Sequence, residues 1–161
     1  MSTADAPLPA APKLEGPAPV VLVVRAPYYT EVVDGLRDGA LRILAEVGAE
    51  VDVLDVAGAL ELAAAIALAA KGTRRRYDAY VALGCVVKGE TDHYDHVCRE
   101  AMAGLTRVGL DGPSCVGNGL LTVHTAEQAL ERSRQDGHNK GAEAAAAALI
   151  QLRAARWLGA V

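Results

Sequence analysis

The stretch from Gly84 to Val97, "GCVVKGETDHYDHV", holds the densest group of residues that could do chemistry. Gly89 would let the backbone approach a ligand closely, and Thr91 could cap a following helix. The first N–H groups of such a helix favour an anion, phosphate above all. His93 would lie in the first turn, where the helix dipole favours the neutral imidazole, which can take and return protons near pH 7. The pattern predicts a phosphate site beside a proton-transfer residue.

A divalent metal is one alternative for this stretch, because Asp92, His93, Asp95 and His96 are all candidate ligands. A helix cannot turn all four to one side, and two histidines three residues apart supply only two ligands. We therefore predict no metal. Structural capping of a helix, without any ligand, stays open as the simplest alternative.

Candidate residues also occur elsewhere in the chain. Glu61, in "AGALE", could accept hydrogen bonds from hydroxyl groups or only complement a helix dipole. Tyr28 and Tyr29 could stack a flat ring or simply pack. Arg132 and Lys140 flank "SRQDGHN" and could hold phosphate together, although solvation is the default for each alone.

Hydrophobic patterning places these residues on an alternating series of strands and helices. "VVLVVRA" is a β-branched run typical of a strand buried on both faces, whereas apolar residues at three- and four-residue spacing before Gly48 indicate an amphipathic helix. "TAEQ" has the pattern of a capping box. The predicted strands are 20–26, 50–56, 77–87 and 114–123, and the predicted helices are 31–47, 61–71, 91–108, 125–134 and 140–158. Such alternation predicts a parallel sheet covered by helices, with ligands beyond the carboxyl ends of the strands.

Length and composition indicate one domain. The chain has 161 residues, of which 52% are hydrophobic, enough for one core and too few for two ordinary domains. Residues 1–19, "MSTADAPLPAAPKLEGPAP", show no apolar periodicity and are interpreted as a flexible tail, with the domain at 20–161. The tail lacks an apolar signal-peptide core, and nowhere is there an apolar run long enough for a membrane span.

Charge and cysteine content narrow the partners and the compartment. A net charge of −4 argues against nucleic acid as a partner. The three cysteines lack C-x-x-C spacing, which favours reduced, buried thiols and a cytoplasmic protein. The alanine-rich segments "ELAAAIALAAK" and "AEAAAAALIQL" have little polar cover, so we expect contact between subunits, with ordinary core helices as the alternative.

Three motifs in this order resemble the 6,7-dimethyl-8-ribityllumazine synthase family. "ALGCVVKGETDHYDHV" is similar to the family's LGxVIRGxTxHxDYV, and "VAGALEL" to VPGAFELP. "EQALERS" followed by "HNKGAEAA" is similar to EQAxxRA and GNKGxEAA. The resemblance runs from about Val20 to Ala147.

The resemblance implies a flavodoxin-like three-layer α/β/α sandwich with a four-stranded parallel sheet, assembled as a homopentamer with active sites shared between subunits. It implies condensation of 5-amino-6-(D-ribitylamino)uracil with 3,4-dihydroxy-2-butanone 4-phosphate in riboflavin biosynthesis, without a cofactor. His93 would transfer protons, Glu90 and Thr91 would line the phosphate, and Arg132 from a neighbouring subunit would pair with it, supported by Lys140. The implied pyrimidine and ribityl contacts are Tyr28, Ala59, Leu60, Glu61, Cys85, Val86, Val87 and Asn118.

Departures from the family pattern concern the aromatic residues. "RAPYYT" carries two extra residues, so either Tyr28 or Tyr29 could be the stacking residue. Leu60 replaces the phenylalanine of GAFE, and Asn118 stands at a second aromatic position expected after the fourth strand. A non-catalytic homologue that binds flavin or lumazine is therefore an alternative, and a monomeric phosphate-binding signalling domain is a third.

Overall fold

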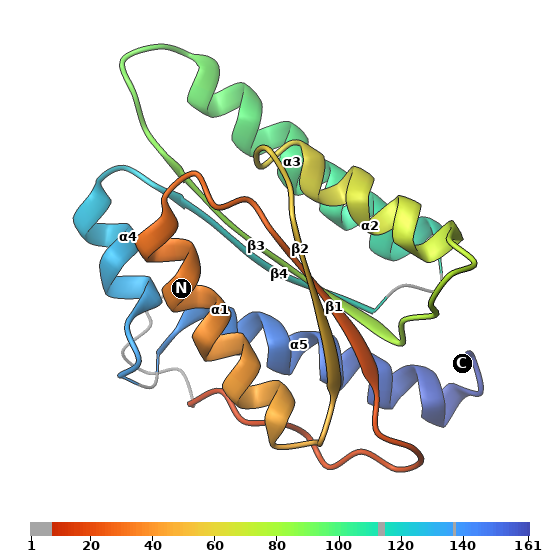
Figure 1. Ribbon diagram of the computed structural model, residues 1–161. Helices are drawn as coiled ribbons and strands as arrows, with labels where there is room; N and C mark the ends of the chain where they lie inside the picture. The colour runs from red at the N-terminus through yellow and green to blue at the C-terminus, as the bar shows by residue number, and fades with distance from the viewer. Residues whose placement is uncertain (1–7, 113–114, 137) are drawn as a thin grey trace.

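Strands and helices alternate along the whole chain in the computed structural model, which describes residues 8–112, 115–136 and 138–161 (Figure 1). The strands are β1 (Val20–Arg25), β2 (Glu50–Asp55), β3 (Ala79–Val87) and β4 (Cys115–Val123). The helices are α1 (Thr30–Ala45), α2 (Glu61–Lys71), α3 (His93–Asp111), α4 (Ala126–Ser133) and α5 (Lys140–Leu158). All the predicted elements are confirmed, apart from shifts at their ends.

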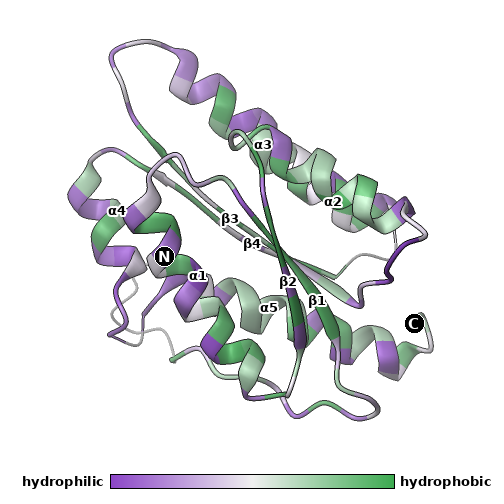
Figure 2. Cartoon of the chain, in the orientation of Figure 1, coloured by the Kyte–Doolittle hydropathy of each residue, from purple (hydrophilic) through white to green (hydrophobic). Residues whose placement is uncertain are grey.

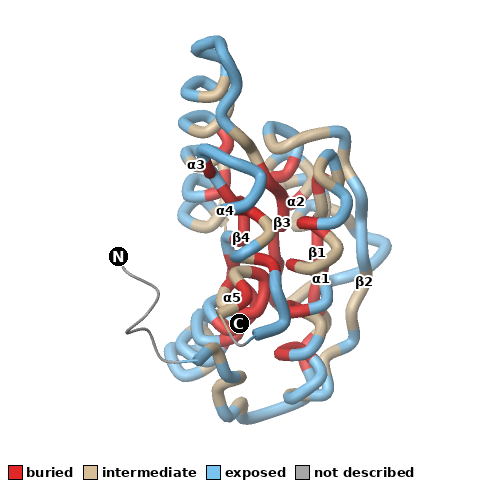
Figure 3. Tube along the Cα trace, turned by 90° about the vertical axis from the view of Figure 1, so that its left-hand side faces the viewer, coloured by how far each residue is buried: buried red, intermediate tan, exposed pale blue. Residues whose placement is uncertain are grey.

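The four strands form one parallel sheet in the order β2-β1-β3-β4. Val23 of β1 marks the register, because it pairs with Val53 on one side and Val81 on the other. β1 and β3 are central, apolar and almost wholly buried, whereas β2 lies at an exposed edge (Figures 2 and 3). This order is that of a flavodoxin-like doubly wound sheet without its fifth strand, so the predicted fold class is confirmed.

Helices cover both faces of the sheet and enclose two apolar cores. α2 and α3 lie on one face, where Leu62, Ile66 and Leu105 are buried against it (Figure 1). α1, α4 and α5 lie on the other face, around Leu36 and Leu149. The two layers place α3 and the α4–α5 pair on opposite faces of the sheet, which matters for the site.

The alanine run of α5 is buried within its own chain. Ala144, Ala145 and Ala148 are at most 3% exposed, because α5 packs on β4 and α1. Gly117 makes this approach possible, since a Cβ there would overlap the carbonyl oxygen of Ala144. For α5 the ordinary core-helix alternative therefore holds, whereas α2 leaves Leu68 exposed.

Several predicted boundaries need correction. β3 begins at Ala79, two residues late, because the Asp78 carboxylate accepts a 2.7 Å hydrogen bond from the Val20 N–H and ends the preceding turn. Thr91 does not cap α3: the helix begins at His93, and its N-cap residue, Asp92, makes no side-chain cap hydrogen bond. Gly48, by contrast, has a φ of 65° after α1, which confirms the predicted glycine stop.

Other features of the ends agree with the sequence. Thr125 caps α4 by accepting a hydrogen bond from the Gln128 N–H, as predicted, although the Gln128 side chain accepts from His124 N–H rather than from Thr125. Ser114, where the fourth strand was predicted to begin, and tail residues 1–7 lie outside the described residues.

Residues 8–19 have no regular secondary structure but make contacts with the domain. Leu14 packs against the core formed with α1 and α5, and the Ala11 N–H donates to the Glu46 carboxylate. The division at residue 20 between tail and domain stays a prediction. No helix in the described part of the chain is long and apolar enough to cross a membrane.

Candidate functional site

The turn from β3 into α3 carries the candidate proton-transfer residue. The hydrogen bonding between β3 and β4 extends one residue past the end of β3, where the Lys88 N–H donates to the Val123 carbonyl at 2.9 Å. Cys85 is buried, Val86 and Val87 are half-buried, and residues 89–93 are exposed. His93 is the first residue of α3, at the end where a helix has backbone N–H groups without intrahelical partners. An imidazole and a set of backbone donors thus meet beyond the carboxyl end of β3.

The turn from β2 into α2 places Glu61 at the same edge of the sheet. The Glu61 N–H donates to the Gly58 carbonyl at 3.2 Å, which makes the turn tight. The Glu61 carboxylate folds back over this turn, since a Cβ at Gly58 would lie 3.1 Å from Glu61 Oε2. Leu60 is about half exposed and Ala59 half-buried, so both offer surface to a ligand.

The two tyrosines after β1 differ in exposure. Tyr29 packs against the apolar core beneath α1, and burial raises the pKa of its hydroxyl above the usual value. Tyr28 is 79% exposed, with its ring edge-on to that of Tyr29 at a centroid distance of 5.1 Å. Only Tyr28 therefore presents a ring face that a flat ligand could cover.

Arg25 is a half-buried cation at this edge that sequence reasoning missed. Its guanidinium bonds both oxygens of Asp55, at 2.7 and 2.8 Å, and donates to Asp34 at 2.8 Å, while only 12% of the side chain is exposed. The bidentate hydrogen bond from Arg25 lowers the pKa of the Asp55 carboxyl. The pair ties the ends of β1 and β2 together directly below the loops that carry Tyr28 and Glu61.

A second group of candidate residues lies along the free edge of β4. A groove of about 400 Å³ is lined there by the outer residues of β4 and by α4 and α5. It brings together Asn118, Arg132 and Lys140, three predicted site residues from separate elements. A parallel edge strand with no neighbour on one side is a surface onto which another chain can pack.

Asn118 lies inside β4, as the predicted strand 114–123 had it, whereas the expectation that the second aromatic position of the family follows the fourth strand is wrong. It pairs in register with Ala82 of β3, three residues after the start of the strand. Its side chain is exposed on the edge, where Nδ2 donates to Met102 Sδ at 3.0 Å and Oδ1 accepts from the Leu120 N–H. The β-branched and aliphatic residues that continue after Asn118 and Gly119 keep the strand extended.

The two cations of the groove differ in how far their charge is already neutralised. The Lys140 ammonium lies 2.7 Å from each oxygen of the Glu143 carboxylate. Arg132 donates to the Gln128 carbonyl at 2.9 Å, and the Glu131 carboxylate, which is 68% exposed, lies 3.8 Å from its guanidinium. Arg132 therefore keeps more of its charge available for an anion than Lys140 does.

Within one chain the two groups of candidates belong to helices on opposite faces of the sheet, although α3 and α4 begin near each other, since the Tyr94 and His124 rings lie 6.3 Å apart. His93 and the Glu61 turn belong to the layer formed by α2 and α3, whereas Arg132 and Lys140 belong to the layer formed by α4 and α5 (Figure 1). The sheet stands between the two layers. The candidate residues of a single chain therefore form two groups, one in each layer.

The cysteines are free and protonated rather than reactive. Burial raises the pKa of the Cys85 thiol to about 11, and burial also raises the pKa of Cys115. Both are buried, as predicted, while Cys98 is half-buried. Among the residues that the structure describes, no three histidine, cysteine or acidic side chains gather in a way that could hold a metal ion.

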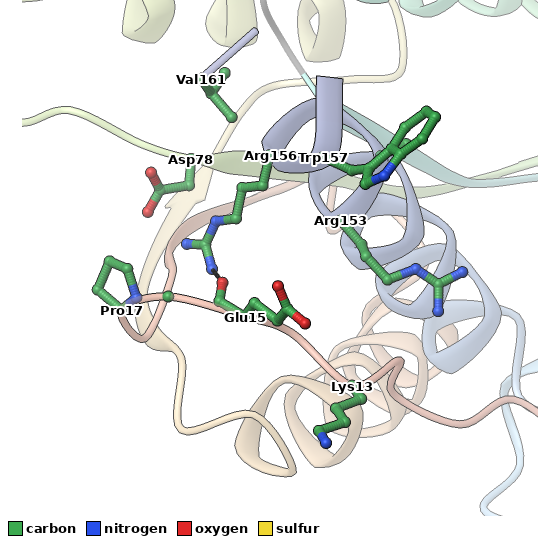
Figure 4. Close-up of a pocket in the computed structure, with 10 residues that line it drawn as sticks. Lys13, Glu15, Pro17, Asp78, Arg153, Arg156, Trp157 and Val161 are labelled. Atoms are coloured by element: carbon green, nitrogen blue, oxygen red, sulfur yellow. Dashed lines mark hydrogen bonds between the residues drawn. The ribbon is translucent and has the colours of Figure 1, made fainter. Parts of the chain in front are cut away.

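Another cavity, of about 830 Å³, lies at the opposite, amino-terminal edge of the sheet. Two arginines line this cavity. The Arg156 guanidinium already donates to the Glu15 carbonyl at 2.6 Å, and the Arg153 and Trp157 side chains point away from Arg156 (Figure 4). The lining side chains do not converge on one point. The candidate site therefore lies at the carboxyl edge and the β4 groove, not here.

Comparison with known proteins gives a consistent result. Residues 19–156 match the family model described as 6,7-dimethyl-8-ribityllumazine synthase. The chain is similar to the 6,7-dimethyl-8-ribityllumazine synthase of Methylorubrum populi, with 46% identity over 152 residues, covering 92% of this chain and 89% of the relative. It is 43% identical to that of Afipia carboxidovorans over 86% of both chains. It is 45% identical to 6,7-dimethyl-8-ribityllumazine synthase 1 of Rhodopseudomonas palustris, again over 86% of both.

Proposed function

This chain belongs to the 6,7-dimethyl-8-ribityllumazine synthase family, and from that membership we propose that its two groups of candidate residues meet across the boundary between neighbouring subunits of a homopentamer. The enzyme condenses 5-amino-6-(D-ribitylamino)uracil with 3,4-dihydroxy-2-butanone 4-phosphate and releases phosphate and water, a step of riboflavin biosynthesis. The observation that carries the proposal is that His93 and Arg132 belong to α3 and α4, which cover opposite faces of the sheet of one chain.

The phosphate of the butanone would bind where the two halves meet. Glu90 and Thr91 offer backbone and hydroxyl groups just before α3, and the N-terminal N–H groups of that helix add favourable dipoles. Arg132 of the neighbour supplies the main cation, and Lys140, held by Glu143, supports it. At Gly89 a Cβ would meet nothing within 4 Å inside the described chain, which is compatible with a ligand passing close by.

The pyrimidine would bind along the ends of β1, β2 and β3. Tyr28 has the exposed ring face needed for stacking, so we assign it rather than Tyr29. Ala59 and Leu60 line the ring and ribityl chain, and Glu61 accepts hydrogen bonds from ribityl hydroxyls. The remaining contacts are the backbone of Cys85, Val86 and Val87 and, from the neighbour, the amide of Asn118.

His93 would move the protons of the reaction. The amine of the pyrimidine attacks the ketone, and loss of water from that adduct gives an imine. Phosphate then leaves with its electron pair, and ring closure with loss of a second water gives the lumazine. Each step needs a proton taken or returned, which one imidazole can do, while Arg132 stabilises the leaving anion. Most of the remaining rate gain comes from holding the two substrates together.

Exposed apolar side chains support assembly. Leu68 on α2, Leu110 on α3 and Trp157 on α5 are all at least 73% exposed in one chain. In the proposed pentamer a neighbouring subunit would cover such side chains. Native mass spectrometry should therefore show multiples of five subunits, and a monomer would contradict the proposal. The free, protonated thiols suit the cytoplasm, which we propose as the compartment.

Mixed assemblies test the shared site directly. Assayed with the butanone phosphate well below its KM, His93→Ala and Arg132→Ala should each be nearly inactive alone, because each removes one half of every site. Co-assembled in equal amounts, they should regain about a quarter of wild-type activity, since a cyclic assembly then has native residues on both sides of that share of its boundaries. No recovery in verified mixed oligomers would place each site within one chain.

The same preparations distinguish the alternative function. Leu60 and Asn118 replace aromatic residues in the family pattern, which favours weaker ring stacking. Mixing the wild-type protein with both substrates should generate lumazine absorbance well above the uncatalysed rate. A purified protein with a flavin spectrum and no turnover would instead identify a binding homologue.

A further inference from the structure

Asn139 is a buried polar residue in the loop between α4 and α5, and only 1% of it is exposed. Its Oδ1 caps α5 by accepting hydrogen bonds from the Gly141 N–H at 2.9 Å and the Ala142 N–H at 3.1 Å. Its Nδ2 donates to three backbone carbonyls, those of Gly35, Ser133 and Arg134, at 2.9, 2.8 and 3.2 Å. One side chain thus joins α1, the end of α4 and the start of α5.

Glycines shape the space for this amide. A Cβ at Gly39 of α1 would overlap Asn139 Oδ1, and a Cβ at Gly141 would overlap the Leu36 carbonyl oxygen. A Cβ at Gly35 would lie 2.6 Å from the Ser133 carbonyl oxygen. At these glycines α1 and α5 have no side chains, which leaves room for the loop between α4 and α5. The Asn139 amide therefore has little space in which to move.

Asn139 is connected to both cations of the β4 groove, to Lys140 through the chain and to Arg132 through a hydrogen bond to the next residue. Lys140 follows Asn139 directly and is the first residue of α5, while Arg132 directly precedes Ser133, whose carbonyl accepts from Asn139. We propose that Asn139 is a positioning residue that sets the spacing between the Arg132 guanidinium and the Lys140 ammonium, and so the affinity of the site for a phosphate monoester. This inference rests on the proposed function, because it assumes that the two cations bind the substrate phosphate.

Asn139→Asp separates this role from capping. Aspartate keeps an acceptor for the first N–H groups of α5, so the helix start is retained. It loses the amide donors and places an acceptor against the carbonyls of Gly35 and Ser133, which releases the loop. We expect the KM for the butanone phosphate and the inhibition constant of inorganic phosphate to rise about tenfold, and the KM for the pyrimidine to change less than about twofold.

Gln151→Leu is the matched control. Gln151 is also on α5 and also donates a side-chain amide to a backbone carbonyl, that of Val116, at 2.8 Å, but it lies far along the helix from Lys140. Its loss should lower the thermal midpoint without changing the ratio of the two KM values. Asn139→Asp with an unchanged ratio, or with equal rises in both KM values, would overturn the positioning role.

Gln135→Ala tests the same clamp if Asn139→Asp does not assemble. The exposed Gln135 amide donates to two of the same carbonyls, that of Gly35 at 2.8 Å and that of Ser133 at 3.4 Å. Its removal should raise the phosphate inhibition constant about two- to threefold with no change for the pyrimidine; an unchanged constant would contradict the proposal. Absence of turnover in the wild-type protein would reject the proposed function instead, so the two failures are distinguishable.

Discussion

Replacing Arg132 with alanine should impair the use of the butanone phosphate far more than the use of the pyrimidine. Arg132 is on α4 at the β4 groove, and within the described residues it forms an ion pair only with the well-exposed Glu131, at 3.8 Å. The substitution removes the guanidinium and the side-chain hydrogen bond to the Gln128 carbonyl, but no buried apolar contact. Folding should therefore be nearly unaffected, and the loss should appear in phosphate recognition.

The size of the effect follows from the exposure of the guanidinium. Two unit charges 4 Å apart attract by about 1 kcal/mol in water and about 4 kcal/mol at an effective dielectric constant near 20. The Arg132 side chain is 37% exposed, so we expect an interaction energy between these two values. We take about 2 kcal/mol, which corresponds to about a 30-fold rise in the KM for the butanone phosphate. Lys140→Ala should cost about threefold, because Glu143 already neutralises much of that charge.

Steady-state kinetics with each substrate varied in turn measure both KM values. The Arg132 effect should shrink as salt is added, since screening weakens the wild-type ion pair. Glu143→Gln is the opposite control: it releases the Lys140 charge and should lower the KM for the butanone phosphate. Equal losses for both substrates, or a larger loss for Lys140→Ala than for Arg132→Ala, would refute the reasoning.

Three further predictions concern single residues. With a pKa of about 11, Cys85 is ionised in only about one molecule in a thousand at pH 8. Iodoacetamide should therefore label Cys85 only after denaturation, as measured by peptide mass spectrometry. Prompt labelling in the native protein would contradict the burial of this thiol. Asp55→Asn should destabilise the fold at neutral pH. Because Arg25 lowers the folded-state pKa of Asp55, the difference from wild type should begin to shrink at about pH 4 and be lost as pH falls further, through the folded-state pKa; a difference that persists at the acid end of denaturation curves would exclude the ion pair as its cause. Gly117→Ala should cost about 3 kcal/mol in urea unfolding, since its Cβ overlaps the Ala144 carbonyl, and an unchanged midpoint would show that α5 can shift.

The element order was predictable because hydrophobic spacing is strong along this chain. The helix before Gly48 and the β-branched strand at Val20 depend on local patterns, and the sheet order then follows from short right-handed crossovers. The errors lie where local patterns compete with distant contacts. Asp78 lies outside β3, and its carboxylate accepts a hydrogen bond from the start of β1. The N-cap position of α3 is occupied by Asp92, one residue after Thr91.

The candidate site was predictable where the type of a residue, by itself, indicates a chemical role. His93, Glu61 and Arg132 attract notice as titratable or charged groups next to strand ends. Arg25 and Asn139 did not, because their roles depend on partners 30 and 104 residues away. An asparagine before a lysine and a glycine reads locally as a helix cap, and only the packing of α1 against the loop shows its second role.

Small residues connect the fold to the site. Gly35, Gly39 and Gly141 let α1 approach the loop before α5, and Gly117 lets α5 lie directly on β4. Because backbone meets backbone at these points, the start of α5 has little freedom to slide relative to the β4 edge. The cation of Lys140 is thereby fixed against the strand that carries Asn118, while the free edge of β4 stays open to a second chain. The close packing inside one subunit thus fixes the residues that, in the proposed assembly, a neighbouring subunit would complete into a site.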